Sequence, residues 1–440
     1  MNEIWYRLNT MGEKTLFEQN NLFDGIIIPA HLLAFYDPSL ISFIEDVNKS
    51  FIIDPMTYVW EQPLENIKSG NILKKSYTKY IEKLECRIGE ILPDSRISIH
   101  DCTDSEITIF VDKILRFQAE IKSINKKNVD RKKSLDRIRR KMSKKVDSEI
   151  RAEYLVPPYF YFTHTNDSNY HLSIQCKKLA VNNKSYSNFE IIPCICMAKE
   201  ILYDRGQINR IIEDYSEHRH VLLWLDEFDD RTASNYELRL LKELIQRFTE
   251  KNVSIINMYG SFYSVLLGYY GLDFFSSGIA LSHRKGVNSV AGGGGLPLRY
   301  YEPTFKQEIV NEDVFTLYSH YPELFVCDCP VCNQISARIR QTQTIEEREI
   351  ILDEFFIEIR RRNAEGKNEL IRPAIMDWTN SRLHFMHVRK AELDLENRLT
   401  SEQMKQLLRN DYNMLNQKVN YILFSRITEP NHLSRWSSQL

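Results

Sequence analysis

Three cysteines stand close together in a C-x-C-x-x-C pattern, at Cys327, Cys329 and Cys332. Zinc is bound by thiolates and imidazoles, and this spacing lets one backbone turn present three thiolates to the same ion. Downstream, His384 and His387 lie three residues apart on a predicted helix, and either one could be the fourth ligand. The alternative is three buried structural thiols in a loop. We expect a structural zinc site, because four protein ligands leave no open position for water.

Carboxylates end two apolar runs that are typical of buried parallel strands. One run ends in Asp54 and another ends in Asp226, with Asp229 just beyond it as a candidate substrate contact. Continuous Ile, Val, Leu and Phe residues without polar alternation indicate strands that are covered on both faces. A carboxylate at the carboxyl end of such a strand lies where barrel enzymes keep their catalytic groups. For Asp54 the alternative is a capping role before Pro55.

Strand-like runs and helical stretches alternate over most of the chain. The apolar runs lie near residues 23–29, 50–54, 189–197, 220–226 and 253–260. Such alternation is typical of parallel βα units. Their number favours an α/β fold with a closed (β/α)8 barrel of the TIM type over an open sheet. We expect the barrel to start in residues 1–63 and to continue in residues 151–325.

A predicted helical insertion interrupts the barrel pattern between residues 64 and 150, and its part near residues 126–145 is strongly basic. Such clusters bind phosphate backbones with an affinity that falls steeply as salt rises. A solvated helical face is the alternative. The basic residues that we expect to contact nucleic acid are Lys132, Lys133, Arg137, Arg139, Arg140 and Lys141.

Two further features have the composition of a ligand site. Four consecutive glycines, among them Gly293 and Gly294, permit close approach of the backbone to a ligand and can aim N–H groups at an anion. A flexible linker is the alternative. Tyr58 and Trp60, which follow the strand that ends in Asp54, are candidates for stacking on a base, although core packing also accounts for such residues.

Composition and terminal sequence limit the class of protein. The chain has 440 residues, of which 43% are hydrophobic, and a formal net charge of -2, which says nothing about partners. The first residues lack the layout of a signal peptide, and no apolar run reaches the length of a membrane span. Eight cysteines, three of them clustered, favour a reducing cytoplasm over a disulfide framework. We expect a cytoplasmic protein whose residues 326–440 form a zinc-binding helical subdomain, with helices over residues 345–362, 384–398 and 401–424.

The cysteine segment, preceded by a barrel-like chain and followed by a helix with histidines, resembles the zinc subdomain of tRNA-guanine transglycosylases. Residues 258–276 are also similar to that superfamily. Residues 283–301 resemble its DNA-modifying, DpdA-type branch more closely than the tRNA enzymes. In this family an aspartate attacks C1′ of a nucleotide and guanine leaves. A 7-deazaguanine base then displaces the aspartate from the covalent intermediate.

The resemblance implies a base-exchange enzyme on nucleic acid, with DNA favoured over tRNA, a 7-deazaguanine as the incoming base and further proteins of a DNA-modification system as partners. Asp54 falls where the family keeps its acid/base carboxylate, although the family's Asp-Ser-Gly-Gly reads Asp-Pro-Met-Thr here. The family's nucleophile position holds Ser276, so we expect Asp226 as the nucleophile and Asp273 as the second choice. Two other functions stay open: a non-catalytic nucleic-acid-binding subunit of a larger complex, and a glycosylase that only removes bases.

Overall fold

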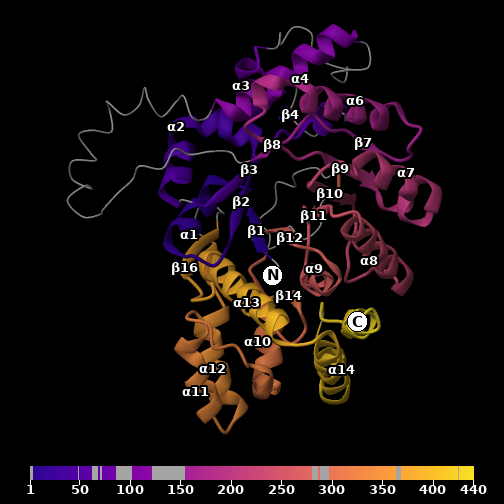
Figure 1. Ribbon diagram of the computed structural model, residues 1–440. Helices are drawn as coiled ribbons and strands as arrows, with labels where there is room; N and C mark the ends of the chain where they lie inside the picture. Colours follow the sequence, from indigo (N-terminus) through magenta and orange to yellow (C-terminus); the bar gives the residue numbers. More distant parts are fainter. Residues whose placement is uncertain are drawn as a thin grey trace.

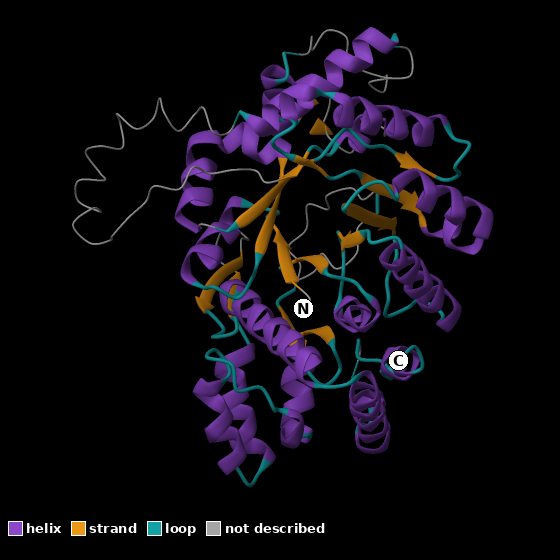
Figure 2. Cartoon of the chain, in the orientation of Figure 1, coloured by secondary structure: helices purple, strands orange, loops and turns teal. Residues whose placement is uncertain are grey.

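The computed structural model describes residues 3–47, 49–61, 68–69, 72–85, 102–120, 154–279, 286–287, 297–362, 368–424 and 426–440. A parallel β-sheet lies at the centre, helices cover its outside, and the C-terminal helices gather at one end of the sheet, as Figure 1 and Figure 2 show. Within the described part of the chain, no helix is both long enough and apolar enough to cross a bilayer.

The central sheet has eight strands, and each neighbouring pair is parallel. Its order is β3-β2-β1-β12-β11-β10-β9-β7. The strands are β1 (Glu3–Arg7), β2 (Gly25–Pro29), β3 (Ser50–Asp54), β7 (Tyr161–Phe162), β9 (Cys194–Ala198), β10 (His220–Asp226), β11 (Ser254–Asn257) and β12 (Phe274–Gly278). Every residue of β2 and β9 is buried, as expected for strands covered on both faces.

The sheet curls so that the first and last of its strands in the chain are neighbours. β1 lies between β2 and β12, with Glu3 opposite Phe274. Among the described residues, the ladder does not continue from β3 to β7, so the structure has an eight-stranded curled sheet where the sequence predicted a closed barrel. Side chains span this gap instead: the Thr57 hydroxyl donates to the Tyr159 carbonyl at 2.7 Å and accepts from its N–H at 2.8 Å.

Helices connect the parallel strands on the outside of the sheet. They are α1 (Lys14–Gln19), α2 (Ala30–Val47), α3 (Lys75–Lys83), α4 (Asp104–Ala119), α6 (Ser168–Asn182), α7 (Arg205–Tyr215), α8 (Asn235–Glu250) and α9 (Phe262–Leu267). Short elements complete this part: η2 (Thr57–Glu61), β4 (Lys68–Ser69), β5 (Ile72–Leu73), β6 (Tyr154–Leu155), β8 (Glu190–Ile191) and η7 (Lys199–Tyr203). The helices α3 and α4 belong to the predicted insertion.

The C-terminal part is helical with two hairpins. Its elements are β13 (Arg299–Glu302), β14 (Gln307–Val310), α10 (Asn311–His320), α11 (Asn333–Gln341), α12 (Ile345–Phe356), β15 (Ile359–Arg362), β16 (Asn368–Arg372), α13 (Trp378–Arg398), α14 (Ser401–Lys418) and α15 (Asn431–Ser437). The prediction of a helix over residues 345–362 was wrong beyond Phe356, because the last four of those residues pair with β16 in an antiparallel ladder.

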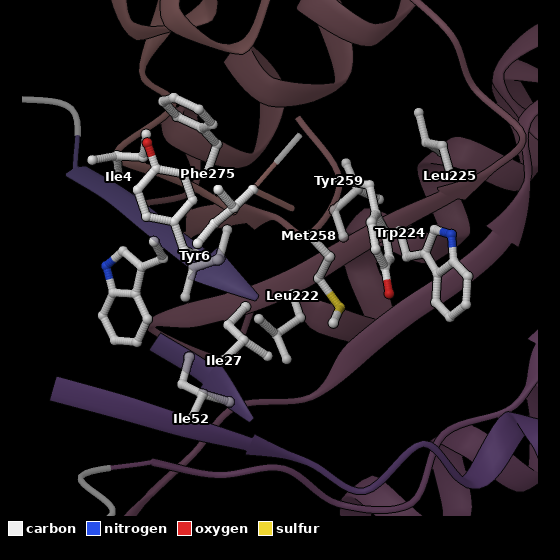
Figure 3. Packing of buried hydrophobic residues seen from close by; sticks show 14 of the residues in the cluster. Ile4, Tyr6, Ile27, Ile52, Leu222, Trp224, Leu225, Met258, Tyr259 and Phe275 are labelled. Atoms are coloured by element: carbon white, nitrogen blue, oxygen red, sulfur yellow. The ribbon is translucent and has the colours of Figure 1, made fainter. Parts of the chain in front are cut away.

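The core lies inside the curl of the sheet, where apolar side chains of different strands meet (Figure 3). Ile27 and Ile52 come from β2 and β3, and Leu222 comes from β10 on the other side. All three side chains are fully buried. Burial of this kind is the main favourable term in folding and fixes the strands whose carboxyl ends carry the polar groups described below.

Candidate functional site

Four potential metal ligands converge in the C-terminal part. The Sγ atoms of Cys327, Cys329 and Cys332 lie 3.7, 3.4 and 3.4 Å from Nδ1 of His384, and all four atoms are within 4.8 Å of one another. Zinc–sulfur bonds of about 2.3 Å and zinc–nitrogen bonds of about 2.0 Å place tetrahedral ligand atoms roughly 3.5 Å apart. The cluster can therefore bind a metal ion and is consistent with zinc.

The surrounding structure orients these ligands. His384 lies on α13, and its Nε2 hydrogen bonds to the carbonyl of Tyr301 in β13 at 2.7 Å, which leaves Nδ1 for the metal. The ring of Tyr300 stacks on His384 with centroids 4.1 Å apart, and its hydroxyl lies 3.5 Å from Sγ of Cys332. Partners of this kind fix the imidazole tautomer and are typical of metal sites.

His387 does not belong to the cluster. The sequence left the fourth ligand open between the two histidines, with His387 named first, and the structure brings His384 and not His387 to the cysteines. The reason is helical geometry: a residue three positions further lies about 4.5 Å along the axis and points about 60° away. His387 is half-buried beside the site.

Asp54 forms a buried ion pair at the carboxyl edge of the sheet. It ends β3, and its Oδ2 lies 2.7 Å from Nη2 of Arg7, which ends β1. Its Oδ1 accepts from the Tyr159 hydroxyl at 2.7 Å and from the Met56 N–H at 2.9 Å. Burial by itself would raise the pKa of Asp54, but the charge of Arg7 and these hydrogen bonds outweigh burial and hold the pKa below its ordinary value. Asp54 is therefore ionised at neutral pH.

Asp226 ends β10 on the same edge, because carboxyl ends of parallel strands share one edge of a sheet. Its Oδ1 accepts from the Val287 N–H at 2.7 Å, and it also accepts a hydrogen bond from Tyr161. Partial burial raises the pKa of Asp226, in the direction opposite to Asp54, and the nearby charge of Glu227 adds to the rise. Asp226 keeps part of its surface open, whereas Asp54 has none.

One short stretch of chain contacts both carboxylates through two tyrosines. Tyr159 contacts Asp54 and Tyr161 contacts Asp226. Because the tyrosines are two residues apart, their Cα atoms are separated by at most about 7 Å. The carboxylates thus flank one short stretch of chain at the open side of the sheet.

Backbone strain accompanies both carboxylates. Met56, two residues after Asp54, has φ of 50°, and Glu227, directly after Asp226, has φ of 52°. Left-handed conformations are uncommon for residues other than glycine, and they concentrate at functional sites. Both turns at this edge therefore hold their aspartates at some conformational cost.

Asp273 is not brought to this edge. It precedes β12 and is exposed at the amino end of the strand, where its Oδ2 accepts from the Ser254 hydroxyl at 2.6 Å. Ser276, at the family's nucleophile position, is a fully buried residue inside β12. Asp273 therefore lies at the opposite edge of the sheet from Asp54 and Asp226, and Ser276 lies within its strand.

The other residues predicted to contact a substrate take part in a turn or in the core packing. Asp229 accepts from the backbone N–H of Arg231 at 3.1 Å and pairs with its guanidinium, which organises the turn after β10. Tyr58 is buried against Trp224, with ring centroids 4.6 Å apart. Trp60 is buried against Phe110 of α4 at 5.4 Å. These rings pack in the core and do not stand open to a base.

Several predicted contacts lie outside the described residues. They are Gly293 and Gly294 and the basic residues Lys132, Lys133, Arg137, Arg139, Arg140 and Lys141.

Sequence reasoning missed three residues of the carboxyl edge: Arg7, Tyr159 and Tyr161. Arg7 had a usable signal, because the short run from Glu3 is apolar and aromatic and ends in a charge. The Arg7 guanidinium also lies 5.5 Å from the ring centre of Tyr259, and its buried Nη1 has no hydrogen-bond partner among the described residues. The tyrosines lie in a stretch rich in aromatic residues, where nothing separates a polar contact from a packing residue.

Comparison with known proteins adds no assignment. No protein-family model matches the sequence, and no curated protein matches it.

Proposed function

We propose that the chain is a base-exchange transglycosylase of the tRNA-guanine transglycosylase kind, which replaces guanine in nucleic acid, with DNA favoured, by a 7-deazaguanine. The observation that carries the proposal is the pair Asp54 and Asp226, which share one edge of a parallel sheet and have pKa values displaced in opposite directions. Two carboxylates in contrasting environments suit a reaction that needs both a nucleophile and a proton-transfer group. The proposal includes the assignment of the curled sheet to a (β/α)8 barrel.

Asp226 would be the nucleophile, because it is the carboxylate that keeps open surface. Its carboxylate oxygen would attack C1′, and guanine would leave with a proton. The incoming base would then give up a proton and displace the aspartate, which divides one difficult displacement into two easier ones. Asp54, which is ionised at neutral pH, would take up the proton of the incoming base through the Tyr159 hydroxyl, which donates a hydrogen bond to it at 2.7 Å, and the departing guanine would take its proton from solvent. A base in a duplex would have to leave the stack to reach this edge.

The Cys3His cluster would bind one zinc ion through Cys327, Cys329, Cys332 and His384. A site with four protein ligands stabilises a fold and offers no position for a reacting water. The zinc would therefore fix the C-terminal part against the sheet and take no part in base exchange.

The experiment uses DNA and tRNA that carry labelled guanine, incubated with the protein with and without a 7-deazaguanine base. Mass spectrometry follows guanine release and base incorporation. We expect incorporation that Asp226→Asn abolishes. Asp273→Asn should leave it intact, because Asp273 lies at the opposite edge. Release of guanine without incorporation would show a glycosylase.

One observation favours a second function, in which the chain is a non-catalytic subunit that binds nucleic acid. Asp54 has no exposed surface, and both of its oxygens are occupied by Arg7, Tyr159 and Met56. Such a carboxylate can be a purely structural ion pair. Binding of nucleic acid without release or incorporation, by folded protein that carries one zinc, would establish this function and refute the enzyme.

A further inference from the structure

Two exposed tyrosines stack on each other at the rim of the sheet. Tyr203 ends η7, which directly follows β9, and Tyr236 lies in the first turn of α8, which follows β10. Their ring centroids are 5.7 Å apart with the planes at 18°, and the two residues are 48% and 46% exposed. Because both elements follow the carboxyl ends of their strands, the tyrosines lie on the same side of the sheet as Asp54 and Asp226.

The stack is held in place by the cap of α8. Glu237 accepts hydrogen bonds from the N–H and the hydroxyl of Ser234, both at 2.8 Å, and also from the Tyr203 hydroxyl. On the other ring, the guanidinium of Arg239 lies 5.1 Å from the centre of Tyr236. Rings that are already fixed lose little conformational entropy when a ligand stacks on them.

A groove of about 430 Å³ lies beside the stack, between η7, α7 and α8. This volume is within the range of about 300–1,000 Å³ that small-ligand sites occupy. The groove is lined by apolar residues such as Leu240, by three cations, Arg205, Arg239 and Arg247, and by two carboxylates, Glu243 and Glu250. Glu243 lies 3.6 Å from Arg239, but exposed pairs of this kind are weak and leave the guanidinium available to a phosphate.

The short helix η7 connects the groove to the edge that carries Asp226, because it directly follows β9 and its Tyr203 lines the groove. Glu200, on the same short helix as Tyr203, is close enough to Asp226 and to Tyr161 for its charge to act on both. η7 thus offers one path along which a strand whose reacting nucleotide lies at Asp226 would leave the site.

We propose that the Tyr203–Tyr236 stack and the groove beside it bind one nucleobase and its phosphate in the strand that flanks the reacting nucleotide. Tyrosine faces stack on any base, and arginines bind the phosphate, so recognition here is independent of sequence. The inference rests on the proposed function for the identity of the reacting nucleotide, but the stacking itself does not depend on catalysis.

The test measures binding of a fluorescein-labelled single-stranded oligodeoxynucleotide with one guanine, by fluorescence anisotropy. We expect Tyr203→Ala and Tyr236→Ala each to weaken binding by about 5-fold or more, as loss of one stacking contact does. Tyr203→Phe keeps the ring but loses the hydrogen bond to Glu237, so it should weaken binding less than Tyr203→Ala does. Trp378→Ala is the matched control, because Trp378 is 38% exposed and contacts Arg382 in the same manner, but lies at the start of α13.

A second experiment removes a nucleobase from the DNA instead of a tyrosine ring from the protein. Oligonucleotides with one abasic position on either side of the guanine are titrated against the parent and Tyr203→Ala proteins. At one position, removal of the base should weaken binding to the parent protein as much as Tyr203→Ala weakens binding of the complete oligonucleotide. The Tyr203→Ala protein should bind that abasic oligonucleotide no more weakly than it binds the complete one. Additive losses at every position, or unchanged binding in both tyrosine variants, would overturn the inference. If this coupling is found while no base is exchanged, the stacking site stands and the proposed enzyme function falls.

Discussion

Asp54 and Asp226 occupy the same edge of the sheet in opposite electrostatic settings. Asp54 is paired with Arg7 and fully buried, whereas Asp226 is partly open and held by one backbone N–H. The consequences for stability have opposite signs, and they can be measured without knowledge of a substrate.

Asp54→Asn should destabilise the protein by about 3–5 kcal/mol, because it leaves the Arg7 charge buried and unpaired. The pKa of Asp54 is lowered on folding, so its contribution is present above the unfolded pKa and is lost as pH falls through the folded pKa. Urea unfolding at neutral and acidic pH measures both effects.

The control for this experiment removes both charges. Arg7→Met with Asp54→Leu should recover most of the loss, since apolar replacements of a buried pair are often tolerated. A double variant as unstable as Asp54→Asn would show that the pair acts through more than its charges.

Asp226→Asn should raise thermal stability at neutral pH. Burial raises the pKa of Asp226 on folding, so the folded protein binds this proton more tightly than the unfolded chain. Stability from this group is therefore highest below the unfolded pKa and declines as pH rises through the folded pKa. Melting curves from acidic to neutral pH should show the variant's advantage growing with pH, and a constant difference would contradict the assignment.

His384→Ala should abolish metal binding, and His387→Ala should retain it, because only His384 meets the three cysteines. Elemental analysis of the purified proteins gives the zinc content. One zinc in the parent and in His387→Ala, with none in His384→Ala, is the expected pattern. Equal zinc in both variants would mean that the histidines can substitute for each other.

At the residue scale, the sequence predicted groups that stand in a recognisable local pattern. The cysteine spacing and the apolar run that ends in Asp54 are patterns of this kind. The side-chain partners of Asp54, Arg7 and Tyr159, are 47 and 105 residues away in the chain, so a local pattern could mark Arg7 as a candidate but could not pair either residue with Asp54. The choice between His384 and His387 also depended on a contact with β13 that only folding creates.

At the scale of elements, α15 fastens the C-terminal part to the turn after β10. The indole N–H of Trp436 donates to the carbonyl of Asp230 at 3.0 Å, and its ring packs on Phe262 of α9 with centroids 5.6 Å apart. Trp436 is fully buried. The helix α15 therefore contacts both the connection after β10 and the connection between β11 and β12.

Trp436→Ala should cost about 3–5 kcal/mol of stability, as removal of a fully buried aromatic side chain does. Denaturant unfolding measures the loss. Ile422→Ala, at a residue that is 93% exposed, is the control and should have little effect. A small loss at Trp436 would mean that α15 is not part of the cooperative unit.

Elements marked by continuous apolar runs were predicted well, and those defined by pairing were not. The strands β3 and β10 appear where the apolar runs placed them. The hairpin of β15 and β16 was missed, because its arginine-rich strands have no apolar alternation and form only by pairing across a gap in the sequence.

At the scale of the whole molecule, α13 joins the metal cluster to the first strand. It carries His384, and the next residue, Phe385, packs on Tyr6 of β1 with ring centroids 6.3 Å apart. We therefore expect a change at the cysteines to reach the sheet through this helix.

Removal of the metal by a chelator should increase amide hydrogen exchange in α13 and in β1, while α8 on the far side of the sheet stays protected. Exchange measured by mass spectrometry with and without zinc tests this prediction. Restored protection after zinc is returned is the control. An increase confined to the cysteine loop would show that the cluster and the sheet are independent.

The pairing of β1 with β12 also has a consequence during synthesis. Glu3 finds its partner only when Phe274 has been made, because these two residues lie opposite each other in the sheet. At about 5–20 residues per second, a ribosome would leave the apolar first strand without this neighbour for on the order of 15–50 s. The nascent chain should therefore depend on chaperones more than its finished form does, and truncated products that end before β12 should aggregate.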